Sequence, residues 1–119
     1  MSKTAGAAAA KDTATYQRLV ARARKSLTSQ EIAALTGVQA RQVQNWAAGA
    51  SRPERRAGDK LLDLDYLISL LEEVYTDEGV EIWLHARNRS LDGQRPIELL
   101  PNDFEAVLAA VERLTTGSM

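Results

Sequence analysis

The sequence contains no cysteine and only one histidine, His85, among its 119 residues. Without cysteine the chain can form neither a disulfide nor a thiolate metal site, and one imidazole cannot build a His-rich metal site. Long apolar runs are also missing: no 18-residue stretch could span a membrane, and the Ala-rich start is too weakly apolar for a secretory leader. We therefore expect a cytoplasmic protein with no membrane segment, no metal site and no cofactor.

The net charge of -1 conceals a division along the chain. Residues 1–60 hold 11 Lys and Arg against 4 Asp and Glu, whereas residues 61–119 hold 4 against 12. A basic half and an acidic half indicate two surfaces with different partners. Charges that merely solvate helix faces would produce the same asymmetry, so the charges alone do not decide.

Apolar residues recur at helical spacing along most of the chain, and no segment carries a convincing strand pattern. Thr28 with Glu31 forms a capping-box pair, and Asp77 and Asn102 are predicted to cap two later helices. The pattern predicts an all-α protein in three parts. These are a flexible arm (1–11), a helix-turn-helix DNA-binding module (12–60) and a helical domain (61–119).

A long helix is predicted from Ser51 and Pro53 to about Tyr75. Its expected apolar stripe comprises Leu61, Leu62, Leu64, Leu67, Ile68, Leu71 and Val74. Such a stripe can form a dimer seam or lie in the core of one chain, and the sequence does not choose between these.

The segment 27–49, LTSQEIAALTGVQARQVQNWAAG, has the features of a helix-turn-helix. Ala33 is small where two helices must approach closely, and Gly37 suits a left-handed backbone conformation in the turn. Val43 and Trp46 would pack the second helix onto the first. An ordinary helical hairpin with a polar face is the alternative.

The face left on that second helix is rich in side chains that can bond to base edges. It consists of Gln39, Arg41, Gln42, Gln44 and Asn45. Phosphate contacts are expected from Arg18, Arg22, Lys25, Arg52, Arg55 and Arg56. One such unit offers little contact surface, so we expect a homodimer on a pseudo-palindromic operator. This half resembles the Xre-type helix-turn-helix of bacterial repressors.

Residues 87–103, RNRSLDGQRPIELLPND, interrupt the helical pattern. Asp92-Gly93 favours a tight turn, Pro96 leads into a short helical turn at 97–100, and Pro101 ends it. A loop stiffened in this way suits a recognition surface, because little entropy is lost on docking. A connector that packs on its own domain explains the same residues equally well.

The order W-x4-N-x2-L-x-G-x2-P-x2-L, from Trp83 to Leu99, is similar to the toxin-binding domain of Xre/MbcA/ParS-type antitoxins. The resemblance covers about residues 28–117, with Arg87 at a position where the family pattern has proline. It implies a type II antitoxin that blocks the active site of a RES-domain, NAD-consuming toxin and represses its own operon. The toxin-binding residues it implies are Trp83, Asn88, Leu91, Asp92, Gly93, Arg95, Pro96, Leu99, Arg113 and Gly117.

Two other functions are to be considered for a chain of this composition. A dimeric Xre-type repressor without a toxin partner would carry the same helix-turn-helix. An enzyme is not expected, because the paired acids Glu72/Glu73 and Asp77/Glu78 are adjacent on helices and point apart, which suits acid–base catalysis poorly.

Overall fold

The computed structural model describes the backbone of residues 2–116 and the side chains of residues 12–116. Within this range the protein is all-α, as the sequence predicts, and its only β pairing is an isolated bridge between Asn88 and Gln94. The elements are α1 (Ser2–Ala23), α2 (Ser29–Thr36), α3 (Ala40–Ala47), α4 (Arg55–Glu72), α5 (Asp77–His85), the 3₁₀ turn η1 (Arg89–Leu91), α6 (Pro96–Leu99) and α7 (Phe104–Thr115).

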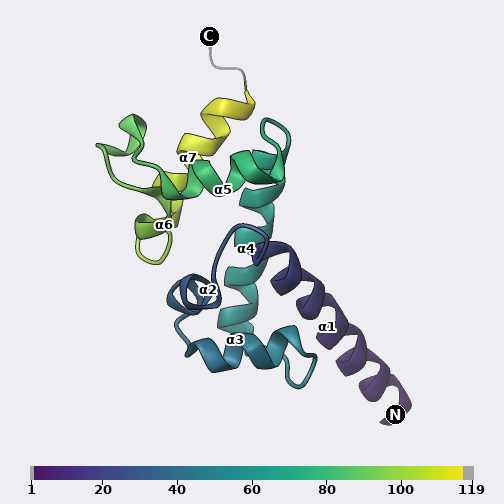
Figure 1. The fold of residues 1–119 in the computed structure, drawn as a ribbon. Coiled ribbons are helices and arrows are strands. Elements are labelled where there is room, and N and C mark those ends of the chain that lie inside the picture. Colours follow the sequence, from purple (N-terminus) through teal and green to yellow (C-terminus); the bar gives the residue numbers. More distant parts are fainter. Residues whose placement is uncertain (1, 117–119) are drawn as a thin grey trace.

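Helix α4 runs through the length of the molecule and joins its two halves (Figure 1). Helices α1 and α2 pack on it, and α3 packs on α1 and α2 at one end of the molecule. Helices α5 and α7 pack on α4 toward the other end, with α6 against both of them. Buried apolar residues from every α-helix but α6 form one continuous core, so the two halves fold around a shared helix.

The N-caps of three helices can be compared with those predicted from the sequence. The capping box at Thr28 and Glu31 is confirmed: the Thr28 hydroxyl accepts from the Glu31 N–H at 3.1 Å, and the Glu31 carboxylate accepts from the Thr28 N–H at 2.9 Å. The other two predicted caps are wrong by one residue, because Thr76 caps α5 and Asp103 caps α7. In both cases the capping oxygen accepts from the N–H three residues on, a reach that fixes the cap position.

Helix α1 begins earlier than the sequence predicts. Its backbone is helical from Ser2, so the predicted arm without regular structure is replaced by a continuation of the helix. Ala has the highest intrinsic helix propensity, so an Ala-rich segment extends a helix without needing an apolar stripe. Helix α1 ends at Ala23, and turns bring the chain to Thr28.

The predicted apolar stripe of α4 is correct except at two positions. Leu61, Leu64, Leu67, Ile68 and Leu71 are buried. Leu62 is 46% exposed because it lies about 100° around the helix from Leu61, and Val74 is 44% exposed because it follows the end of the helix. The stripe therefore belongs to the core of one chain.

Arg22 fixes α1 against α4. Its guanidinium contacts the Asp65 carboxylate at 2.6 Å, the Glu72 carboxylate at 3.2 Å and the Ser69 hydroxyl at 3.1 Å. The hydrogen bond to Asp65 raises the pKa of Arg22, although burial opposes this. Arg22, for which the sequence predicts a phosphate contact, is thus directed at carboxylates of α4.

Candidate functional site

The turn between α2 and α3 holds these helices at a fixed angle. Gly37 has φ 76°, the left-handed conformation that the sequence predicts. The N–H groups of Gly37 and Val38 both donate to the Ala33 carbonyl, at 2.8 and 3.1 Å. Ala33 is buried, so its small side chain permits the close approach of the two helices.

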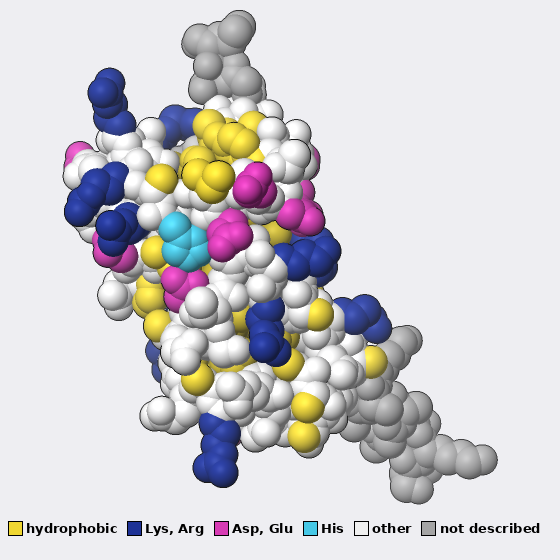
Figure 2. Space-filling model, in the orientation of Figure 1, with side chains coloured by type: hydrophobic (Ala, Val, Ile, Leu, Met, Phe, Trp, Pro, Cys, Tyr) yellow, Lys and Arg dark blue, Asp and Glu magenta, His cyan; other side chains and the backbone are white. Residues whose placement is uncertain are grey.

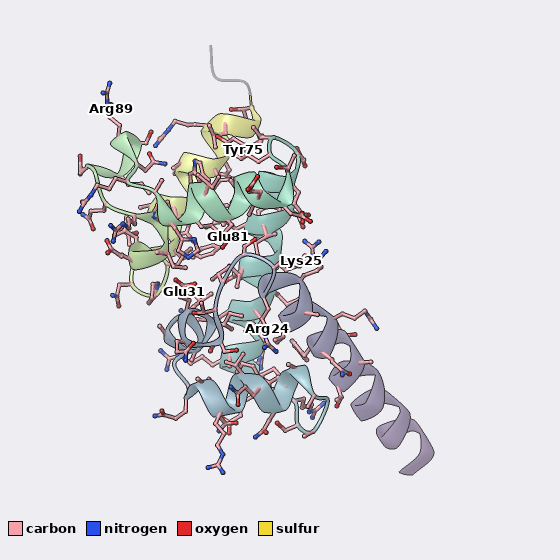
Figure 3. The ribbon with its side chains drawn as sticks, in the orientation of Figure 1. Arg24, Lys25, Glu31, Tyr75, Glu81 and Arg89 are labelled. Atoms are coloured by element: carbon pink, nitrogen blue, oxygen red, sulfur yellow. The ribbon has the colours of Figure 1, made fainter. Side chains whose placement is uncertain are left out.

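Helix α3 is divided sharply between a buried and an exposed side. Val43 and Trp46 lie in the core. The exposed residues are those that the sequence assigns to base contacts: Gln39, Arg41, Gln42, Gln44 and Asn45. Figure 3 shows side chains of α3 projecting from the end of the molecule, away from α4. A row of amide and guanidinium groups on one exposed helix can pair with the edges of bases in a DNA major groove.

Some of the predicted phosphate-binding residues lie beside α3 and others lie far from it. Arg52 and Arg56 line an open cleft of about 380 Å³ together with Gln42, so they lie beside the exposed face of α3. Arg52 also forms a 2.9 Å ion pair with Asp12. Lys25 lies just after the C-terminal end of α1, in a hollow that residues of α5 also line. It is therefore far from the exposed face of α3 (Figure 3).

Arg55 and Arg18 are also exposed. Arg55 stands in the first turn of α4, beside Arg56, and lines a second hollow together with Arg52. The structure therefore gathers Arg52, Arg55 and Arg56 at the start of α4. Cations at such a place can contact DNA phosphates that flank the bases read by α3.

The turn-rich segment 87–100 forms a closed unit at the other end of the molecule. The Asn88 side chain accepts from the Ser90 N–H at 2.8 Å, and the Asn88 backbone bonds both Gly93 and Gln94. Asp92 and Gly93 both have positive φ, 57° and 80°, which makes the tight turn that the sequence predicts. Leu91 is buried against the domain, so the loop is held from inside as well as by its own hydrogen bonds.

The predicted toxin-binding residues divide by exposure. Leu91 and Pro96 are buried, and Trp83, Asn88, Gly93 and Leu99 are half-buried. Asp92, Arg95 and Arg113 are exposed, and Gly117 lies outside the described residues. The two buried residues therefore belong to the core of the domain, and the exposed and half-buried residues are the ones with surface that a partner could contact.

A contact between the two halves was not expected from the sequence. The two nitrogens of the His85 ring lie 2.8 Å from the Glu81 carbonyl and 2.9 Å from the Glu31 carboxylate, while Glu31 also closes the capping box of α2 (Figure 3). Both partners are acceptors, so only the protonated imidazolium can donate to both. Burial lowers the pKa of His85, but the bonds to Glu81 and Glu31 outweigh it and the net shift is upward. No local signal could have revealed this pair, because its members are 54 residues apart.

Among residues 12–116, no group of three or more His, Asp or Glu side chains could hold a metal ion. In the same part of the chain, no helix combines the length and the apolar character needed to cross a membrane.

The fold defines a two-part helical protein, with an amide-rich helix exposed at one end and a closed turn-rich domain at the other. The sequence profile of the antitoxin Xre/MbcA/ParS C-terminal toxin-binding domain matches residues 70–114. The probable mycobacterial cidal antitoxin Rv3188 of Mycobacterium tuberculosis (strain ATCC 25618 / H37Rv) is 44% identical over 93 residues, which cover 77% of this chain and 79% of the relative. The chain belongs to the Xre/MbcA/ParS family of antitoxins.

Two further similarities agree with this family assignment. The mycobacterial cidal antitoxin MbcA of Mycobacterium bovis (strain ATCC BAA-935 / AF2122/97) is 28% identical over 95 residues, which cover 79% of this chain and 84% of the relative. A chain in the crystal structure of the M. tuberculosis MbcT–MbcA toxin–antitoxin complex superposes with a TM-score of 0.71 and 26% identity, over 90% of this chain and 96% of that chain.

Proposed function

We propose that this protein is a type II antitoxin that binds a cognate RES-domain toxin and blocks its NAD-consuming active site. The observation that carries the proposal is the match of residues 70–114 to a toxin-binding domain. The similarity of nearly the whole chain to a protein from a toxin–antitoxin complex supports it. The toxin-binding half begins in the last part of α4, so the partner is expected at the end of the molecule formed by α5, α6 and α7.

We propose in addition that the α1–α4 half represses the antitoxin's own operon by binding double-stranded operator DNA. The exposed amide and guanidinium groups of α3 support this assignment, as do Arg52 and Arg56 beside Gln42 and the neighbouring Arg55. A single exposed helix of this size reads few base pairs, so a homodimer within a larger toxin–antitoxin complex is the form expected to bind the operator. The protein would then act in the bacterial cytoplasm, at the nucleoid.

The toxin-neutralising function is tested by measuring NAD consumption by the purified cognate toxin as the full-length protein is added. Inhibition that saturates at a fixed ratio of the two proteins is the expected result. An undiminished rate with both proteins folded would contradict neutralisation. If the protein then still bound its operator tightly, it would be a repressor without a toxin partner.

A further inference from the structure

The toxin-binding half carries an apolar surface that its own core does not use. We define the α5 patch as Val74, Tyr75, Ile82 and Leu114. Ile82 is 60% exposed, the largest value among the large apolar residues described, and Val74 and Leu114 are 44% and 37% exposed. In Figure 2 hydrophobic side chains gather over α5 and α7 on this end of the molecule. Isolated apolar residues on a surface are ordinary, but a contiguous group is typical of a binding site.

Gly79 makes the patch continuous. A Cβ atom at this position would lie 2.9 Å from the Cβ of Tyr75, so the Tyr75 side chain rests directly on the backbone of α5. Gly79 and Ile82 are three residues apart in α5, which places them on one side of the helix, and Tyr75, in the bend before α5, lies against Gly79. This side is opposite to the buried Val80 and Leu84, so it faces outward.

Leu114 extends the patch from α7. It follows Val107 and Val111 along the core-facing side of α7, but it stands in the last turn of the helix and is 37% exposed. The end of α7 and the turn that contains Val74 lie at the same end of the molecule (Figure 1). The apolar side chains of the patch thus come from the turn after α4, from α5 and from α7, all within the matched residues 70–114.

Carboxylates border the patch. Glu73, Asp77, Glu78 and Glu81 are all exposed, and none of them forms a salt bridge within the described part of the chain. Figure 2 shows acidic side chains beside the hydrophobic group. Arg89, one of the arginines of this half, stands on the turn-rich loop, on the far side of the domain from Tyr75 (Figure 3). Four of the 12 Asp and Glu residues of 61–119 are therefore exposed on α5 and in the turn before it.

We propose that the α5 patch is the surface on which the toxin docks, and that the toxin offers an apolar depression bordered by Lys and Arg. The inference rests on the proposed antitoxin function and assigns its contact surface. An apolar centre with a charged border is the usual anatomy of a specific protein interface, in which the centre supplies most of the affinity and the border sets the partner and the association rate. The turn-rich loop then serves to hold α6 and α7, and it is not the main contact.

The test compares two leucine-sized apolar residues that differ in position. Ile82→Lys places a cation in the centre of the α5 patch, where it would face the cations of the toxin. Leu62→Lys is the matched control, because Leu62 is 46% exposed on α4 and lies outside the matched domain. Binding of each full-length variant to the purified toxin is measured by calorimetry, and operator binding of the same samples shows that the chain is folded.

We expect Ile82→Lys to weaken toxin binding about tenfold or more, as for a residue in the centre of an interface, and Leu62→Lys to leave it unchanged. Glu78→Gln should reduce the dependence of toxin affinity on ionic strength, which is a second readout that does not depend on apolar contact. Wild-type affinity for Ile82→Lys, or an equal loss for Leu62→Lys, would overturn the assignment of the surface while the antitoxin function stands. Absence of toxin binding by the wild-type protein would instead refute the proposed function itself.

Discussion

The crossing of α1 and α4 allows a sharp test of packing, through Gly58. An ideal Cβ atom at this buried position would lie 2.8 Å from the Tyr16 hydroxyl oxygen, and 3.1 and 3.2 Å from two carbons of the ring. Gly58 is in the interior of α4 and donates to the Glu54 carbonyl, so its backbone is ordinary helix. The substitution Gly58→Ala therefore sets helix propensity directly against a steric contact.

The two effects have opposite signs. Replacing glycine by alanine inside a helix stabilises the fold by about 0.5–1 kcal/mol. Inserting a methyl group into a packed contact costs about 1–3 kcal/mol, and the hydroxyl oxygen and two ring carbons of Tyr16, all closer than 3.4 Å, require its side chain to shift. We expect the steric cost to win, with a net loss of about 1 kcal/mol, or about 3–6 °C in Tm for a chain of this size.

A double-mutant cycle separates the two effects. In a Tyr16→Leu background the ring is gone, so Gly58→Ala should stabilise the protein by up to about 1 kcal/mol. Urea unfolding of the four proteins, followed by circular dichroism and by the fluorescence of Trp46 and Trp83, gives the free energies. The packing argument is refuted if Gly58→Ala has the same effect in both backgrounds.

The exposed face of α3, the His85–Glu31 contact and the Arg22–Asp65 ion pair can each be tested by substitution. Arg41→Ala should weaken operator binding by about 1–3 kcal/mol in a mobility-shift titration at fixed salt, whereas equal loss on unrelated DNA would show a phosphate contact only. Because the pKa of His85 is raised on folding, its contribution to stability is fully present below the unfolded value of 6.5 and is lost as pH rises through the folded pKa. Urea unfolding of the wild type at a series of pH values should show a lower free energy of unfolding as pH rises above 6.5. If His85→Gln lost the same free energy over the same pH values, the loss could not be assigned to His85. Arg22→Met should cost about 1–2 kcal/mol, since the pair with Asp65 is about one-third exposed, and much less in an Asp65→Asn background.

The features that could be predicted from sequence are those that depend on neighbours along the chain. The capping box at Thr28, the left-handed Gly37 and the Asp92-Gly93 turn need only a few consecutive residues, so composition and spacing reveal them. The contacts of Arg22 with α4 and of His85 with α2 join residues 43–54 positions apart, and no local pattern encodes them. The exposed polar face of α3 could be predicted because the spacing of residues within one helix defines it. The exposure of Ile82 could not be predicted, because it depends on which distant elements pack against α5.

The loop that marks the family in the sequence and the surface that fits a partner are different parts of the domain. Asn88 and Gly93 close the loop through backbone hydrogen bonds, and Leu91 and Pro96 are buried, so each would be required by the fold even without a partner. A motif of this kind identifies the domain, but it offers few atoms to a toxin. The atoms available for contact are those that the fold leaves outside its core, and Ile82 is the most exposed of the large apolar ones. The specificity of this antitoxin for its toxin should therefore be altered by substitutions on α5, with the loop left unchanged.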